Sequence, residues 1–164
     1  MKDLPVRKPN RLKDYNYGGN GAYFITICVK DRHEMLGKIV GAAIGRPFQT
    51  TLSEYGTIVD KAIQKIGEKY ESVKVDQYVI MPNHIHMILT VDDRRAMRAP
   101  TISTVINQFK GYVSKQIGFS LWQKSFHDHI IRDERDYQNH WQYIDENPAR
   151  WAEDEYYGGR LNVY

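Results

Sequence analysis

The chain has 164 residues, of which 41% are hydrophobic and 26% charged, and its formal net charge is +3. This composition is typical of a globular protein of one domain and excludes a disordered chain. The single cysteine, Cys28, excludes an intramolecular disulfide and any zinc site built from several cysteines. No apolar run approaches the roughly 20 residues of a membrane span, and the first residues lack the apolar centre of a signal peptide. We therefore expect a cytoplasmic protein that does not enter a membrane.

Charge is distributed unevenly along the chain. Residues 1–13 hold five basic residues and one acidic residue, so this stretch carries +4 and the other 151 residues sum to −1. A basic arm on a nearly neutral body favours contact with a polyanion such as nucleic acid, although a solvated terminus has the same composition. We assign residues 1–20 as a basic N-terminal arm, 21–155 as the folded domain and 156–164 as a C-terminal tail. The candidate DNA contacts in the arm are Arg7, Lys8, Arg11 and Lys13.

The first third of the folded domain predicts a strand followed by a helix. Residues 22–30 are rich in aromatic and β-branched types and follow a glycine-rich stretch, which predicts a strand. The irregular segment that follows contains a candidate short strand near 37–41. A capping box at 51–54, with Thr51 as its hydroxyl residue, predicts the start of an amphipathic helix that reaches about residue 70.

The middle of the chain predicts a hairpin and a second helix. Two strand-like runs, 73–81 and 84–91, are separated by two residues, which is hairpin spacing. A charged linker at 92–100 follows. Apolar residues at helical spacing then predict a helix over 102–117, and Gly118 is placed to end it.

The last part of the chain predicts a fourth strand at 125–132 and a third helix at 134–147, which Pro148 ends. The complete order, β-α-β-β-α-β-α, predicts an α+β protein. Its first six elements form a ferredoxin-like βαββαβ antiparallel sheet with two helices on one face, and the C-terminal helix is additional. The other face of the sheet is where a site could lie.

Two histidines on the second strand of the hairpin share one face. Side chains on a strand alternate, so His84 and His86 point one way while Ile85 and Met87 point toward the core. Two adjacent imidazoles can bind one cation through their nitrogens. Two ordinary strand histidines would give the same pattern.

A second pair with the same spacing, His127 and His129, lies on the fourth strand. Asp128 would point to the opposite face of a regular strand, away from both histidines. Packing or a phosphate contact is therefore a better interpretation of this pair than a metal site.

The third helix carries a tyrosine and an asparagine one turn apart. Tyr143 and Asn147 can present a phenol and an amide oxygen to the same point, on a stripe that also contains His140. A tyrosine that only packs would show the same spacing. The core stripe of this helix is expected to consist of Tyr137, Trp141 and Ile144.

Several stretches, taken in order, resemble one family. Residues 81–86 read Met-Pro-Asn-His-Ile-His, and residues 143–148 read Tyr-Ile-Asp-Glu-Asn-Pro. Between them lies Trp-Gln-Lys-Ser-Phe-His-Asp-His at 122–129, and the expected first strand precedes them. Together they resemble the REP-associated tyrosine transposases (RAYTs), members of the single-tyrosine HUH transposases. The resemblance spans nearly the whole chain, with little to match in the linker or in the last dozen residues.

The resemblance implies a role for each matching residue. His84 and His86 match the motif histidines that bind a divalent cation, Mg²⁺ or Mn²⁺, and Asn147 matches an amide-type third ligand. Tyr143 matches the nucleophile, which the additional C-terminal helix would carry. The pair on the fourth strand matches no ligand position.

The activity implied by the resemblance is that of an HUH-type DNA endonuclease and strand transferase. Such an enzyme nicks and joins single-stranded DNA with imperfect hairpins through a 5′-phosphotyrosine, and acts as a monomer or homodimer. Lys110 and Lys115, on the polar side of the second helix, could hold phosphates. Two other functions fit the sequence less well: a non-catalytic nucleic-acid-binding module of the same fold, and a small metal hydrolase, for which the histidine strand lacks carboxylates.

Overall fold

The computed structural model describes residues 21–41, 47–92, 94 and 99–157. The basic arm, with Arg7, Lys8, Arg11 and Lys13, lies outside these residues, as do most of the linker and residues 158–164 of the tail. None of the helices in the described part of the chain combines the length and apolarity needed to cross a bilayer.

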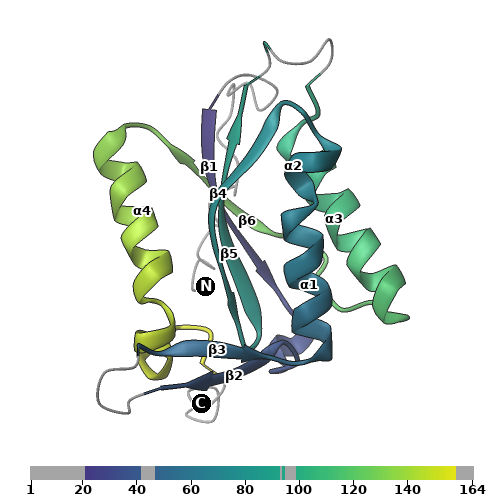
Figure 1. Cartoon of the computed structure of the whole chain (residues 1–164), viewed down its shortest axis with the longest axis vertical. Helices are drawn as coiled ribbons and strands as arrows, with labels where there is room; N and C mark the ends of the chain where they lie inside the picture. The colour runs from purple at the N-terminus through teal and green to yellow at the C-terminus, as the bar shows by residue number, and fades with distance from the viewer. Residues whose placement is uncertain (1–20, 42–46, 93, 95–98, 158–164) are drawn as a thin grey trace, which may run out of the picture.

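A four-stranded antiparallel sheet forms the centre of the fold, and its order is β4-β5-β1-β6. Its strands are β1 (Gly21–Cys28), β4 (Val73–Met81), β5 (His84–Val91) and β6 (His127–Ile131). The helices are α1 (Glu54–Gln64), α2 (Ile66–Lys69), α3 (Ile102–Ile117) and α4 (Glu134–Glu146). Figure 1 shows α1, α2 and α3 on one face of the sheet and α4 on the other. The strand order and connections confirm the predicted ferredoxin-like α+β fold.

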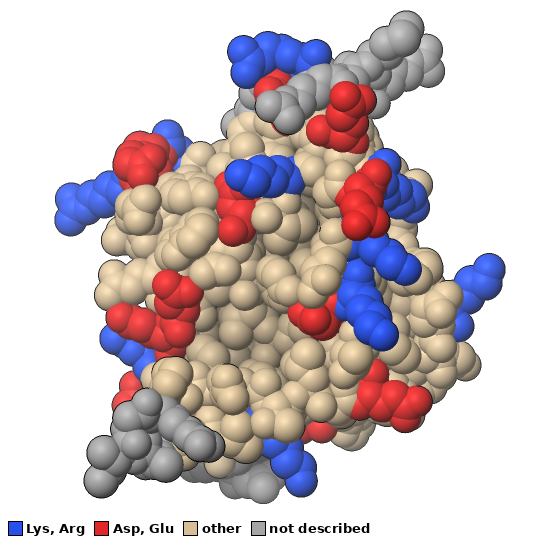
Figure 2. Space-filling view, in the orientation of Figure 1, with Lys and Arg blue, Asp and Glu red and all other residues tan. Residues whose placement is uncertain are grey.

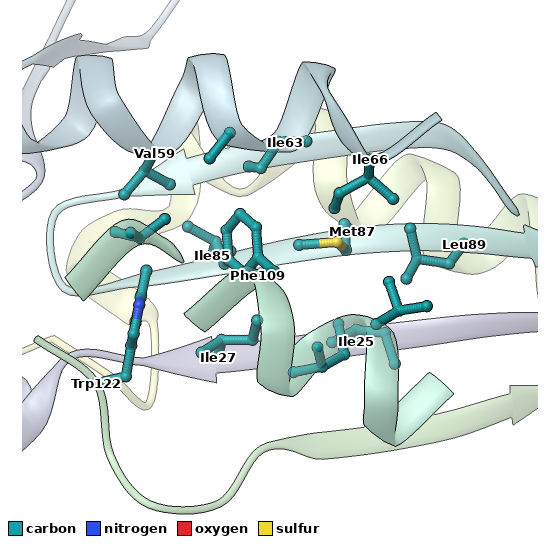
Figure 3. Close-up of a cluster of buried hydrophobic side chains, with 14 of the residues drawn as sticks. Ile25, Ile27, Val59, Ile63, Ile66, Ile85, Met87, Leu89, Phe109 and Trp122 are labelled. Atoms are coloured by element: carbon teal, nitrogen blue, oxygen red, sulfur yellow. The ribbon is translucent and has the colours of Figure 1, made fainter. Parts of the chain in front are cut away.

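The hydrophobic core lies between the sheet and the helices α1 to α3 (Figure 3). Alternate residues of β1 and β5 face it and are completely buried. Because the side-chain period of a strand is two, the residues between them must face α4. The core residues are Tyr23, Ile25, Ile27, Ile85, Met87 and Leu89 from these strands, with Val59, Ile63, Val105, Ile106 and Phe109 from the helices.

The start of α1 differs from the prediction. Thr51 lies in β3 (Gln49–Leu52), which pairs with β2 (Gly37–Val40), so the predicted capping box is wrong. Ser53 is the N-cap instead, and its Oγ accepts a hydrogen bond from the backbone N–H of Gly56 at 3.1 Å. A Cβ at Gly56 would collide with the backbone carbonyl of Leu36, so glycine allows the β2 segment to approach the helix.

Several other boundaries are close to their predictions. The long first helix is divided into α1 and α2 at Lys65. Helix α3 has its predicted bounds, with Thr101 as N-cap and Gly118 at φ 97° as C-cap. Strand β6 is shorter than predicted. Two short 3₁₀ turns were not predicted, η1 (Lys30–Arg32) and η3 (Pro148–Glu153).

Helix α4 rests on the sheet largely through polar contacts. The Tyr137 hydroxyl donates to Asp76 Oδ2 at 2.8 Å, and Gln77 Nε2 donates to Asp145 Oδ1 at 2.7 Å. Of the three residues predicted as a core stripe, Ile144 is buried, whereas Tyr137 and Trp141 are half-buried. The stripe prediction was therefore wrong in part, because α4 covers a polar face of the sheet and not a second apolar core.

Candidate active site

Two buried histidines lie at the start of the inner strand β5, on the face of the sheet that α4 covers. Their neighbours on β1 are Cys28, opposite His84, and Thr26, opposite His86. Both imidazoles are almost completely buried, and their Nε2 atoms are 3.1 Å apart. The spacing of the two residues on one strand therefore produces converging nitrogens. Burial raises the pKa of the Cys28 thiol to about 11, so this thiol is protonated at neutral pH.

The hydrogen bonds of Asn83 determine which nitrogen of His84 carries the proton. The Asn83 amide nitrogen donates to the backbone carbonyls of Arg32 at 3.2 Å and Tyr156 at 2.6 Å. Its Oδ1 must then be the atom that faces His84 Nδ1 at 2.8 Å, and an amide oxygen can only accept. His84 therefore carries its proton on Nδ1, and the lone pair of Nε2 is available to a cation.

His86 is held from two sides. Its Nδ1 lies 2.8 Å from the Thr26 hydroxyl, and its ring stacks on Phe24 with centroids 5.1 Å apart. Burial lowers the pKa of His84 to about 3 and that of His86 well below its ordinary value. Both imidazoles are thus neutral at physiological pH, which is the form that binds metal ions.

These two histidines should make the stability of the metal-free protein depend on pH. An unfolded chain protonates them near pH 6.5, whereas the folded chain excludes the His84 proton down to about pH 3. Between these values the unfolded state binds more protons, so the free energy of unfolding decreases as the pH falls, by up to about 1.4 kcal/mol per pH unit for each histidine. We expect the free energy of unfolding, measured with urea in chelator over a pH series, to depend less steeply on pH in His84→Asn than in wild type. The difference in slope should correspond to about one proton. The exposed His33→Asn is the control, and equal slopes in His84→Asn and wild type would contradict the prediction.

Two oxygen-bearing side chains complete the polar cluster. The Asp154 carboxylate is buried, and its Oδ2 lies 3.9 Å from His84 Nε2. One ligand atom each from His84, His86 and Asp154 can be chosen so that all lie within 4.8 Å of one another. Asn147, at the end of α4, is also buried, and its Oδ1 has no hydrogen-bond partner among the described residues.

This donor set fits a divalent metal ion. Neutral imidazole nitrogens together with carboxylate and amide oxygens are ligands that divalent cations accept. The buried carboxylate accepts a hydrogen bond from the Tyr156 backbone N–H at 2.8 Å, and a cation beside it would balance its charge and also satisfy the Asn147 oxygen. The histidine strand itself has no carboxylate, as the sequence shows, and this one comes from the segment after η3.

Two tyrosines lie against the histidines. The ring of Tyr143, on α4, is 5.2 Å from that of His86, and its side chain is 40% exposed. The ring of Tyr156 is 4.4 Å from that of His84, and the Arg32 guanidinium lies 5.3 Å from its centroid. Burial raises the pKa of both phenols, so each is protonated at neutral pH. The structure thus offers two hydroxyl groups where the sequence indicated one.

A groove of about 460 Å³ opens this site to solvent. His86 and the exposed part of Tyr143 line this groove, which continues along β6. Its lining residues include Phe24, His86, His127, His129, His140, Tyr143 and Tyr156.

The two lysines predicted to contact DNA have different surroundings. The Lys110 ammonium donates to the backbone carbonyls of Gln123 at 2.6 Å and Lys124 at 3.2 Å, and burial lowers its pKa. The Lys110 ammonium therefore makes hydrogen bonds within the protein, whereas the Lys115 side chain is exposed. In Figure 2, Lys and Arg alternate with Asp and Glu over the visible face and form no single basic patch.

Three residues of the site were missed by the sequence analysis. Asn83 was read only as part of a turn, although its position directly before the histidine pair was a usable signal. Asp154 and Tyr156 follow η3, where no periodicity predicts which way a side chain points. Tyr156 is the first residue of the stretch that the sequence assigned to the tail, and it packs on His84.

No family model matches the chain. It is 33% identical to an uncharacterized protein of Haemophilus influenzae over 92% of its own length and 93% of the relative's. A second Haemophilus influenzae protein, provisionally named a REP-associated tyrosine transposase, is 29% identical over 86% of this chain and 76% of the relative. The REP-associated tyrosine transposase of Escherichia coli K12 is 25% identical over 82% and 70%.

A solved structure of a REP-associated tyrosine transposase bound to a REP hairpin has the same fold. It superposes on 85% of this chain and 73% of that chain with a TM-score of 0.63 at 22% identity. The curated relatives and the order of motifs agree with it. In sequence, in the order of its motifs and in fold, the chain is similar to the REP-associated tyrosine transposases.

Proposed function

We propose that this protein nicks and rejoins single-stranded DNA beside imperfect hairpins through a covalent bond to Tyr143. The observation that carries the proposal is that Tyr143 lies against His86 in a groove open to solvent, and that His86 and the buried His84 have converging nitrogens. The relatives' names and the hairpin bound to the structural neighbour support hairpin-containing DNA as the substrate.

The reaction we propose is a transesterification at one phosphate. The Tyr143 oxygen loses its proton and forms a bond to phosphorus, while the bond from phosphorus to the 3′ oxygen breaks and that oxygen takes up a proton. The products are a 5′-phosphotyrosine and a free 3′-OH. Rejoining reverses the exchange with a new 3′-OH and needs no nucleotide cofactor, because the phosphodiester energy is kept in the covalent bond.

We propose that His84, His86 and Asp154, with Asn147 beside them, hold a Mg²⁺ or Mn²⁺ ion. When bound, this ion would withdraw charge from the scissile phosphate and orient it for in-line attack. The chain's own part is to keep both imidazoles neutral and to point the Nε2 atoms at the same place. Asn83 and Thr26 do this through the opposite ring nitrogens.

Helix α4 positions the nucleophile over the sheet of its own chain. The bonds from Tyr137 to Asp76 and from Gln77 to Asp145 attach the helix to β4 on either side of Tyr143. One chain therefore supplies every group in the proposal, so a monomer can be active. The experiment that tests the function is incubation of the protein with Mg²⁺ or Mn²⁺ and a panel of single-stranded hairpins, followed by detection of a covalent protein–DNA adduct.

The basic arm gives a separate prediction about binding. If Arg7, Lys8, Arg11 and Lys13 contact phosphates, deletion of residues 1–13 should weaken hairpin binding and reduce the slope of log K against log salt by about 3 to 4. Cleavage of saturating substrate should continue, because none of the groups proposed for the chemical step belongs to the arm. Fluorescence anisotropy over a salt series measures the slope, and an affinity equal to that of the full chain at every salt concentration would mean that the arm is only solvated.

A further inference from the structure

A second group of side chains that could hold a metal ion lies beside the groove, and two of its members line it. His129 belongs to β6, and Asp136 and His140 are one turn apart on α4. One ligand atom from each can be chosen so that all lie within 4.8 Å of one another. None of the three belongs to the histidine pair or to the nucleophile described above.

The three side chains already contact one another. His129 Nε2 lies 2.8 Å from Asp136 Oδ2, and His140 Nδ1 lies 3.1 Å from Asp136 Oδ1. The two imidazole rings stack with centroids 4.6 Å apart and an interplanar angle of 23°. A carboxylate or carbonyl oxygen can only accept, so both ring nitrogens donate N–H in the metal-free protein, and His140 Nδ1 also faces the Asp136 backbone carbonyl at 2.8 Å. An ion bound here would therefore release these protons and take their place between the carboxylate and the two rings.

The charge of the group favours a cation over an anion such as phosphate. Burial acts to raise the pKa of Asp136, but hydrogen bonds from His129 and from the Arg132 backbone N–H outweigh it and lower that pKa. The carboxylate is therefore ionised at neutral pH and would repel a phosphate oxygen. Two imidazoles and one carboxylate are also the ligands that zinc-class ions take in open sites, where a water or another oxygen completes the coordination.

We infer that His129, Asp136 and His140 form a second metal site, which binds a divalent transition-metal ion of the zinc class. The pair Asp136 and His140 has the i, i+4 spacing that places two ligands on one face of a helix. His129 supplies the third ligand from β6. An ion here would join the N-terminal half of α4 to β6, at the end of the helix opposite Asn147.

The site is accessible to an ion from solvent. The side chain of His129 is 47% exposed, and those of Asp136 and His140 are 23% and 22% exposed. His129 and His140 also line the groove. Because this site shares no ligand with the histidine pair, the inference does not depend on the proposed nicking reaction.

The test is a count of bound zinc on the full chain after removal of metal with a chelator. Isothermal titration with Zn²⁺, repeated with Co²⁺ and read by its visible absorption, should give one equivalent fewer in His129→Ala than in wild type. His140→Gln should lose the same equivalent from the helix side. His127→Ala is the matched control, because it removes an exposed histidine of the same strand and groove that lies outside the cluster, and it should keep the wild-type number of equivalents.

Two further measurements test whether the variants fold and whether Zn²⁺ stabilises the protein through this site. Circular dichroism in chelator should show that His129→Ala and His140→Gln fold as wild type does, since both positions are at least partly exposed. Zn²⁺ should raise the melting temperature of wild type more than that of His129→Ala. Equal stoichiometry and affinity in wild type, His129→Ala and His140→Gln would overturn the inference. Loss of the DNA adduct alone would not bear on it, because zinc binding is measured without DNA.

Discussion

Replacement of Tyr143 by Phe should abolish the covalent protein–DNA adduct and leave hairpin binding within about twofold of wild type. The substitution removes one hydroxyl and keeps the ring that packs edge-on against Phe24, with centroids 5.9 Å apart. Since the side chain is 40% exposed, its loss of polarity should cost little stability. The adduct is measured by denaturing electrophoresis of labelled hairpin DNA with Mg²⁺ or Mn²⁺ present.

Tyr156→Phe and Tyr137→Phe are the matched comparisons. Tyr156 lies nearer to His84 than to His86, and its hydroxyl belongs to a segment after η3 and not to the helix that carries Asn147. Tyr137 donates to Asp76, so its replacement should lower stability by about 1 to 2 kcal/mol through loss of a hydrogen bond to a charged group. Both variants should still form the adduct.

The outcomes separate the candidate functions. An adduct that persists in Tyr143→Phe but disappears in Tyr156→Phe would identify Tyr156 as the nucleophile and refute our assignment. Tight hairpin binding by wild type with no adduct on any hairpin of a broad panel would make the non-catalytic DNA-binding module the better explanation.

The sheet and its histidine pair could be predicted because both depend on a period of two. Alternation along 84–91 assigns Ile85, Met87 and Leu89 to the core and the two histidines to the opposite face, and the structure has this arrangement. The bounds of α3 could also be predicted from the sequence, because Thr101 and Gly118 are local capping signals.

Other features depend on contacts that no local pattern encodes. Thr51 looks like a helix cap, but pairing between β2 and β3 places it in a strand. Tyr137 and Trp141 have the spacing of a core stripe, yet the surface beneath α4 is polar, so Tyr137 finds Asp76 and stays half-buried.

The acidic residue of the site was unpredictable for a similar reason. Asp154 follows a 3₁₀ turn with a distorted backbone at Arg150, and its direction depends on how the chain returns to the sheet. That return is held by the bond from the Asn83 side chain to the Tyr156 carbonyl, a contact between residues 73 positions apart.

The second large effect that we expect is a change in the Mg²⁺ requirement of cleavage when the residues of the polar cluster are replaced. His84→Ala or His86→Ala should abolish adduct formation at any Mg²⁺ concentration, because each removes one of the two converging nitrogens. Asp154→Asn should instead raise the Mg²⁺ concentration needed for half-maximal cleavage by about 10- to 100-fold, since it removes the negative charge but keeps an oxygen.

Two other variants determine whether Asp154 or Asn147 is the more important oxygen donor. Glu155→Gln is the matched control for charge, because the neighbouring Glu155 is exposed and lines the groove without belonging to the cluster. It should leave the Mg²⁺ requirement near that of wild type. Asn147→Ala should raise the requirement less than Asp154→Asn, because Mg²⁺ binds a carboxylate more strongly than an amide oxygen. If Asn147→Ala has the larger effect and Asp154→Asn behaves like Glu155→Gln, then the amide is the third ligand and Asp154, which accepts a hydrogen bond from the Tyr156 backbone N–H at 2.8 Å, is not one.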